Sequence, residues 1–227
     1  MRSRLDPILT GDLGISGYYV YDSIQKYQNS IFVELGTYIG ESTQVFLLDA
    51  EAKNNYIHSI DVSFESLPER IKNNSRLNLI LGDSATVGKY WKDPYDVLFV
   101  DTFHIREQVL SELHYWYPHI KEGGLLIFHD TNWPDDKHDE YGGIVWDRPE
   151  EAIKDFFNIP SLNFEDEYIR SVNYPEKWGV TIIEIKKKTS YDNNSVDWED
   201  VFAKRNHLIG LFWNDENKKN VQIDLKF

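Results

Sequence analysis

The sequence contains no cysteine among its 227 residues. A disulfide framework and catalysis by a thiolate are therefore excluded. Positive charge is also scarce, because 24 Lys and Arg stand against 38 Asp and Glu and the formal net charge is −14. Nucleic acids and anionic membrane surfaces are bound largely through Lys and Arg. We therefore expect neither a nucleic acid nor a membrane as a partner.

Long apolar runs are missing as well. No run of about eighteen apolar residues, the length of a membrane-spanning helix, occurs in the chain. The first residues, Met1–Pro7, lack the apolar core of a secretory signal. We therefore expect a soluble, cytoplasmic protein. The length fits one α/β domain with additions, and an aromatic content of 15% suggests an aromatic-lined site as well as a core.

Short apolar runs are what the chain does contain, and helical segments separate them. Five of these runs predict buried strands, at residues 31–33, 56–61, 77–85, 96–101 and 125–130. Two more, 164–172 and 178–185, are joined by a segment too short for a parallel crossover, so this pair must be antiparallel. The pattern predicts an α/β fold with a three-layer Rossmann-like sheet, mostly parallel with an antiparallel terminal strand. The expected strand order is 3-2-1-4-5-7-6.

The first of these strands runs into a glycine-rich loop that opens a helix. The loop reads Glu34-Leu-Gly36, then Gly40 and Ser42. Glycine lets a backbone turn sharply and approach a ligand closely, and nucleotide-like ligands bind at such loops. Glu34 stands where the dinucleotide fingerprint has its first glycine. Its carboxylate would repel a pyrophosphate and would suit a cationic amino-acid group. A loop that only packs is the alternative interpretation.

The next two strands also end in an acid. Asp61 lies about twenty residues beyond the glycine loop, where an acid binds ribose hydroxyls in doubly wound folds, and Asp83 ends the third strand. With Glu34 they form a row along one edge of the sheet. The row and the loop resemble class I S-adenosylmethionine (SAM) dependent methyltransferases, in which the loop holds the methionine part and the third acid accepts from the adenine amino group. The resemblance implies SAM as cofactor, bound by Glu34, Gly36, Gly40, Ser42, Asp61, Asp83 and Ser84.

Carboxylates and histidines gather at the ends of the fourth and fifth strands. Asp101 and His104 follow the fourth strand, and His129 and Asp130 end the fifth. Parallel neighbours should bring Asp101 against His129 and Asp130, and such ligands suit Mg²⁺, Mn²⁺ or Ca²⁺. A hydrogen bond between Asp101 and His129 that only orders the loop is the alternative. Histidine titrates near neutral pH, so His104 is the candidate general base, with Asp101 as its catalytic neighbour.

These residues carry a narrower resemblance. The spacing of Asp101 and His104, followed by Gly-Gly-Leu-Leu-Ile-Phe-His-Asp-Thr, is similar to the small metal-dependent O-methyltransferases. It also resembles their antibiotic-sugar O-methyltransferase and cephalosporin-hydroxylase-like relatives. In the catechol type, an Asp after the fourth strand and an Asp-Asn pair after the fifth hold Mg²⁺. The resemblance therefore implies Mg or Mn on Asp101, His129 and Asp130. The sequence departs from the pattern at His129, which replaces a carboxylate, and at His104, where Lys is frequent.

The chain divides into a main domain and an extension. We expect residues 1–188 to form the SAM-binding methyltransferase domain with an N-terminal helical arm, and residues 189–227 to form a C-terminal extension. Within the extension, the apolar stretches 208–213 and 221–227 predict a β-hairpin. The hairpin would dock on the sheet edge or contribute to a dimer.

Two irregular segments lie near the expected site. Residues 10–17 are rich in glycine, and this segment is predicted to form either a flap over the ligand or an ordinary N-terminal arm. The loop 131–148 is long, acidic and aromatic, and loops of this length are frequently functional. We expect it to cover the acceptor substrate.

The function that we infer from the sequence is SAM-dependent O-methylation of a hydroxyl on a small molecule or sugar. Three alternatives stay open, and a homo-oligomer is compatible with each of them. One is an NAD-dependent oxidoreductase, against which Glu34 in the fingerprint position counts. The second is a hydroxylase-like relative. The third is a SAM-binding or partner-binding protein without turnover.

Overall fold

The structure is a computed structural model that describes residues 2–133, 140–141, 144–145, 148–189 and 196–212. These residues build an eight-stranded sheet in the order β3-β2-β1-β4-β5-β10-β9-β8. The first five strands are parallel, and β10, β9 and β8 continue the sheet antiparallel. The predicted order is confirmed, with β8 as one additional edge strand. The strands are β1 (Ile31–Leu35), β2 (Tyr56–Asp61), β3 (Leu77–Leu81), β4 (Tyr95–Val100), β5 (Ile120–His129), β8 (Phe164–Glu165), β9 (Ile169–Tyr174) and β10 (Val180–Ile185), while β6 (Glu140–Tyr141) and β7 (Ile144–Val145) pair separately.

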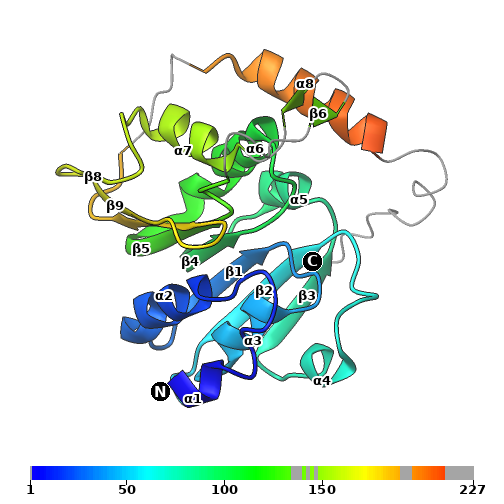
Figure 1. The fold of residues 1–227 in the computed structure, drawn as a ribbon, viewed down its shortest axis with the longest axis vertical. Coiled ribbons are helices and arrows are strands. Elements are labelled where there is room, and N and C mark those ends of the chain that lie inside the picture. The colour runs from blue at the N-terminus through cyan, green and yellow to red at the C-terminus, as the bar shows by residue number, and fades with distance from the viewer. Residues whose placement is uncertain (1, 134–139, 142–143, 146–147, 190–195, 213–227) are drawn as a thin grey trace.

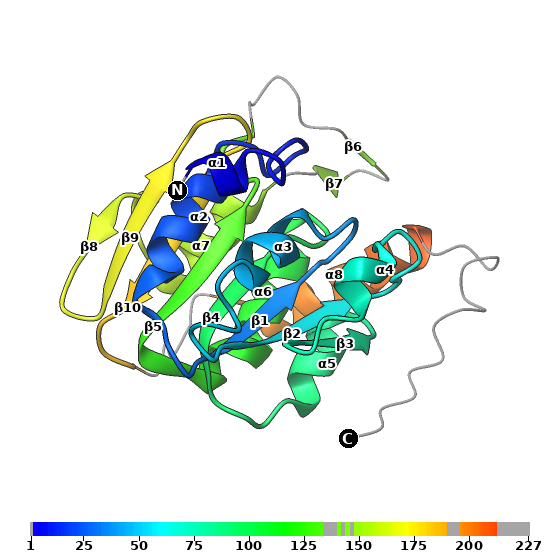
Figure 2. The same cartoon turned by 90° about the horizontal axis from the view of Figure 1, so that it is seen from below.

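Helices cover both faces of the sheet (Figures 1 and 2). Successive strand residues point to opposite faces, so Val33 and Leu98 pack in one hydrophobic cluster and Phe32 and Val97 in the other. The helices α2 and α3 lie on one face, and α5, α6 and α7 lie on the other, with α8 packed outside α6. The helices are α1 (Arg2–Leu5), α2 (Ser16–Ser23), α3 (Glu41–Leu47), α4 (Glu69–Lys72), α5 (Ser84–Tyr90), α6 (Arg106–Trp116), α7 (Pro149–Phe157) and α8 (Trp198–Phe212), with 3₁₀ turns η1 (Ile24–Lys26) and η2 (Tyr117–His119).

Two of the helices that separate the strands are short. The helix after β1 ends at Leu47, and the helix after β2 is only the four residues of α4. Pro68 has an extended backbone and stands directly before α4. A residue that precedes proline disfavours the helical region, so the helix begins only after Pro68. Of the helices that the structure describes, none is both long and apolar enough to cross a membrane.

The C-terminal extension differs from the prediction. Residues 208–212 belong to α8, so the first strand of the predicted hairpin is wrong, while Trp213 and residues 221–227 lie outside the described residues. The buried residues of α8 include Val201, Arg205 and Leu208, which recur with helical spacing. The apolar stretch is therefore the end of an amphipathic helix and does not form a strand.

Candidate active site

The carboxyl ends of the parallel strands form the site, and a glycine brings two of them together. Gly36 follows β1 and has a φ of +86°, a conformation that disfavours other residues. Its N–H donates to the carbonyl of Ile60 on β2 over 2.9 Å. Its Cα also lies against the backbone of Asp101, which follows β4. The loop after β1 is thus fixed between its two neighbouring strands.

Glu34 is enclosed below this loop and is fully buried. Its carboxylate accepts hydrogen bonds from Ser42 Oγ over 2.7 Å and from Thr43 Oγ1 over 2.8 Å, and also from Ser59 Oγ. Burial raises the pKa of Glu34 to about 7, although the hydrogen bonds from the three hydroxyls oppose this shift. Glu34 therefore ties the start of α3 to β1 and β2.

Asp61 organises the same loop from the end of β2. Its Oδ2 accepts from the backbone N–H of Thr37 over 2.7 Å and from that of Tyr38 over 2.9 Å, and its Oδ1 accepts from Ser63 N–H over 3.0 Å. Oriented backbone donors of this kind hold a carboxylate in one position. Asp61 also lines the larger cavity at this edge.

That larger cavity, which we call the nucleoside cavity after the ligand proposed below, has a volume of about 550 Å³, within the usual size range of ligand sites. Of the predicted cofactor-binding residues, Gly36, Asp61, Asp83 and Ser84 line it. Ser42 lines a second cavity, described below. All of the predicted residues lie in the described part of the chain, and within it Glu34 and Gly40 line neither cavity. The structure therefore brings most, but not all, of the predicted set together.

Several residues of the nucleoside cavity were not identified from the sequence. They include Tyr38, Phe103, Gln108, Arg205, Asn206 and Ile209. Tyr38 and Phe103 follow predicted strand ends, so their proximity to the sheet edge was a usable signal. Arg205, Asn206 and Ile209 belong to α8, and no local pattern in the sequence connects that helix to the sheet.

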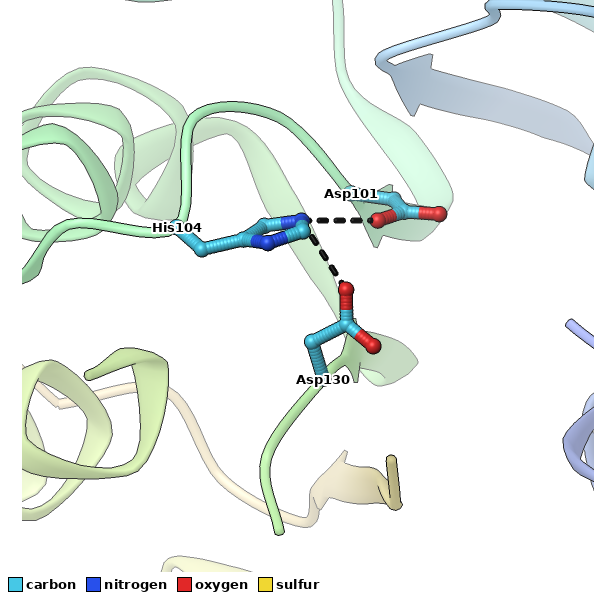
Figure 3. Close-up of side chains that lie close together, drawn as sticks. All are labelled: Asp101, His104 and Asp130. Atoms are coloured by element: carbon cyan, nitrogen blue, oxygen red, sulfur yellow. Dashed lines mark hydrogen bonds and ion pairs between the residues drawn. The ribbon is translucent and has the colours of Figure 1, made fainter. Parts of the chain in front are cut away.

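Asp101, His104, His129 and Asp130 form one acid–imidazole cluster at the ends of β4 and β5. His104 Nε2 lies 3.3 Å from Asp101 Oδ1 and 3.0 Å from Asp130 Oδ2, so the ring points between the two carboxylates (Figure 3). His129 Nδ1 lies 3.5 Å from Asp101 Oδ2 and 3.2 Å from Asp130 Oδ1. Asp130 has a φ of +56°, in the left-handed region that Asp tolerates better than most residues. The predicted proximity of Asp101, His129 and Asp130 is thus observed.

The carboxylates and imidazoles of the cluster shift each other's pKa values towards the charged forms. Burial lowers the pKa of His129, but the neighbouring Asp101 and Asp130 outweigh it and raise that pKa to about 10. Burial likewise raises the pKa of Asp101, but His129 and His104 outweigh it and hold the pKa well below its usual range. At neutral pH, His129 therefore carries a positive charge between two carboxylates.

The cluster also has the composition of a divalent-cation site. Asp101, His104 and Asp130 each offer one ligand atom, and these atoms lie within 4.8 Å of one another. Carboxylate oxygens with one imidazole suit Mn²⁺ and Mg²⁺. Asp130 Oδ1 is buried, and its contact with His129 Nδ1 at 3.2 Å is one with which a bound ion would compete. His104, and not the predicted His129, has the better placed nitrogen, because His129 is only 2% exposed.

A second cavity of about 460 Å³, which we call the acceptor cavity, opens beside the cluster. It shares Gly36, Tyr38 and Asp101 with the nucleoside cavity. The glycine-spotted segment 10–17 contributes Gly11, Asp12 and Leu13 to its lining. The Glu41 carboxylate holds this segment, because it accepts from Gly11 N–H over 2.7 Å and from Leu13 N–H over 3.0 Å. The segment is therefore a wall of the cavity. Most of the loop 131–148, predicted to cover the acceptor, lies outside the described residues.

Part of the chain is similar in sequence to known methyltransferases. Residues 33–131, which run from within β1 to just past β5 and include the acid–imidazole cluster, match a family profile described as a methyltransferase domain. Over 86 residues the chain is 28% identical to demethylmacrocin O-methyltransferase from Streptomyces fradiae. That match covers 34% of this chain and 21% of the relative, so the chain spans about a fifth of its length.

Solved structures show the same fold. A Klebsiella pneumoniae protein named for an assumed O-methyltransferase activity superposes with a TM-score of 0.59 at 14% identity, covering 81% of this chain and 90% of that one. The MycE methyltransferase of mycinamycin biosynthesis was solved with Mg, S-adenosylhomocysteine (SAH) and mycinamycin VI. It superposes with a TM-score of 0.57 at 18% identity, and the match covers 89% of this chain and 57% of MycE. CalS11, a TDP-rhamnose 3′-O-methyltransferase of calicheamicin biosynthesis, superposes with a TM-score of 0.54 at 14% identity, covering 81% of each chain.

The sheet has the fold of these solved methyltransferases, and residues 33–131 match the methyltransferase-domain profile, so the resemblance inferred from the sequence is confirmed as a likeness of fold and of this segment. The matched segment carries Gly36, Asp61, Asp83, Asp101 and Asp130.

Proposed function

We propose that this protein transfers a methyl group from SAM to a hydroxyl of a small molecule or sugar. One observation carries the proposal: the nucleoside cavity and the acceptor cavity meet at Gly36, Tyr38 and Asp101, beside the acid–imidazole cluster. A cofactor in the first cavity and an acceptor in the second would meet at that junction. The O-methyltransferase activities named for the demethylmacrocin enzyme and CalS11 favour a hydroxyl acceptor. The methyltransferase-domain match counts against the alternative of an NAD-dependent oxidoreductase.

SAM would lie along the loop after β1. Asp61 would accept from the ribose hydroxyls, since its oxygens retain acceptor capacity beside the loop amides. Asp83 and Ser84 would bind the adenine end, and Gly36 would admit the methionine part close to the backbone. The buried position of Glu34 favours a positioning role, in which its contacts with Ser42 and Thr43 hold the loop that touches the cofactor.

In the reaction, the acceptor oxygen attacks the methyl carbon of the sulfonium. The carbon–sulfur bond breaks, its electron pair stays on sulfur to give SAH, and the hydroxyl proton must leave. His104 would take that proton, because Asp101 and Asp130 flank its Nε2 and would stabilise the imidazolium that forms. Asp101 lines both cavities and so stands where oxygen and methyl group would meet.

A divalent ion fits the same cluster. Asp101, His104 and Asp130 would hold it, and a bound Mg²⁺ or Mn²⁺ would lower the pKa of a coordinated acceptor hydroxyl. With an ion bound, His104 would act as a metal ligand. Without an ion, His104 would act as the general base. The two arrangements use the same three side chains.

The test begins with the purified protein. Mass spectrometry of small molecules retained on it should identify SAM or SAH, and calorimetry should give binding of both, whereas NAD should not bind. Methyl transfer from isotope-labelled SAM should then be measured against a panel of sugars, glycosides and phenols. Binding of SAM without turnover on any hydroxyl acceptor would favour the non-catalytic alternative, and the absence of SAM binding would overturn the proposal.

A further inference from the structure

The C-terminal helix α8 packs against the methyltransferase core and reaches the nucleoside cavity. Figure 1 shows it lying across the outside of α6. Aromatic contacts fix it there: the Trp198 ring lies 4.5 Å from that of His114, and Phe202 stacks on Tyr115 at 5.6 Å. One face of the helix then presents Arg205, Asn206 and Ile209 to the cavity.

Arg205 connects α8 to the residue assigned to the adenine. Its guanidinium donates to Asp83 Oδ1 through Nη2, and to Gln108 Oε1 through Nε over 2.7 Å. The Arg205 residue is only 8% exposed, so this contact is shielded from solvent. Gln108 in turn donates to Ser84 Oγ over 3.0 Å and to Glu112 Oε1 over 2.8 Å. The helix is thus part of a buried polar network under the cavity floor.

Within the described residues, the hydrogen bonds of Asp83 leave one acceptor position for a donor. Its Oδ2 accepts from the backbone N–H of Thr86 over 2.8 Å and from Thr86 Oγ1 over 2.6 Å, while its Oδ1 accepts from Arg205. A carboxylate has about four acceptor positions, so about one stays available on Oδ1 beside the cavity. An adenine 6-amino group is a donor of the right kind for that position.

We propose that α8 is the outer wall of the adenine subsite, with Arg205 positioning Asp83 and Ile209 contacting the base. The inference rests on the proposed SAM-binding function and adds to it a role for the C-terminal extension. Arg205 neutralises the charge of Asp83 and fixes its orientation, so that Oδ1 distinguishes a 6-amino purine from a 6-oxo purine. Ile209 lies one turn after Arg205 and supplies the apolar surface against which the base packs.

The test measures SAH and S-inosylhomocysteine binding by calorimetry in the full chain. Wild type should bind SAH more tightly than S-inosylhomocysteine, because the 6-oxo group of the latter is a hydrogen-bond acceptor and would face the acceptor oxygen of Asp83. Arg205→Ala should weaken SAH about tenfold or more and should narrow the preference for SAH over S-inosylhomocysteine by a similar factor. Ile209→Trp should weaken both ligands by filling the cavity. Lys204→Ala is the matched control, because Lys204 is an exposed neighbour that pairs with Asp200 on the surface.

Hydrogen exchange of the 198–212 segment separates recognition from folding. Arg205→Ala should keep the wild-type protection of α8 without ligand, and SAH should increase that protection in wild type. If Arg205→Ala weakens the binding of SAH and of S-inosylhomocysteine by the same factor, so that the preference for SAH is unchanged, Arg205 does not position Asp83. If both Arg205→Ala and Ile209→Trp bind SAH as tightly as wild type, α8 is not a wall of the adenine subsite. The same conclusion follows if Lys204→Ala loses as much SAH affinity as these two variants. Neither result would contradict the proposed methyltransferase function. No SAH binding by wild type would overturn the proposed function first, and this inference with it.

Discussion

Gly36 and Asp101 meet backbone to backbone, and a Cβ added at Gly36 would lie 1.9 Å from the carbonyl oxygen of Asp101. This contact joins the loop after β1 to the end of β4. Both cavities include the two residues, so their shape depends on this close approach.

The Gly36→Ala variant should therefore be strongly destabilised. Gly123→Ala is the matched control, because Gly123 also has a positive φ, of +77°, but an added Cβ there meets nothing within 4 Å. We expect the control to lose about 1–2 kcal/mol from backbone strain alone. Gly36→Ala should lose a further 1–3 kcal/mol, roughly, from the clash. Urea unfolding measures the free energy of unfolding of both variants. Equal losses in Gly36→Ala and Gly123→Ala would show that the loop after β1 relaxes to accommodate the added Cβ.

Removal of the Asp61 carboxylate should weaken SAM binding. A charged hydrogen bond to ribose is worth about 1.5–3 kcal/mol, so Asp61→Ala should reduce affinity roughly tenfold to a hundredfold. Since Asp61 also holds Thr37 and Tyr38, Asp61→Asn separates the charge from the loop contacts and should show a smaller loss. Unchanged affinity of Asp61→Ala by calorimetry would rule out the ribose role.

The buried Glu34 should make the protein less stable as pH rises. Its pKa is about 7 in the folded chain, against an ordinary value of about 4.3, so the folded state binds more protons between these values. The stabilisation is full below about pH 4 and is lost as the pH rises through about 7. Between pH 5 and pH 8, wild type should lose on the order of 1–3 kcal/mol more unfolding free energy than Glu34→Gln. The same slope in both proteins would contradict the raised pKa.

Manganese binding should identify the ligands in the acid–imidazole cluster. The geometry predicts that His104→Ala and Asp130→Asn weaken Mn²⁺ binding, whereas His129→Gln retains most of it. Paramagnetic resonance titration of free Mn²⁺ measures affinity independently of activity. The reverse ranking of the two histidines would support the set inferred from the sequence, Asp101, His129 and Asp130. If wild type binds no Mn²⁺ or Mg²⁺ and works after exhaustive chelation, the cluster acts without an ion.

Replacement of His104 should impair methyl transfer without impairing cofactor binding. General-base catalysis contributes about 10²–10⁴ in rate, so single-turnover transfer by His104→Ala should fall by that factor. SAH affinity should stay near that of wild type, and His207→Ala, an exposed histidine on α8, should behave as wild type in both assays. The pH profile from pH 6 to 9 should also change. A wild-type rate with an unaltered profile would exclude His104 as the base.

The sequence by itself determined the sheet and the row of polar strand ends. Parallel strands joined by crossovers place their carboxyl ends at one edge, so Asp61, Asp83, Asp101 and Asp130 had to gather there once the strands were recognised. The short link between β9 and β10 equally required an antiparallel pair. These conclusions follow from chain connectivity and strand period, both of which are local.

Only the tertiary structure decided which way the side chains of this edge face. Glu34 lies within β1, and its side chain points to three hydroxyls and lines neither cavity, although its position in the motif predicted a ligand contact. The left-handed backbone of Asp130 aims its carboxylate at His104. Arg205 meets Asp83 across 122 positions of the chain, through a helix whose last residues, 208–212, the sequence pattern predicted to be a strand. Such contacts depend on how distant elements pack, and no periodicity within either segment encodes them.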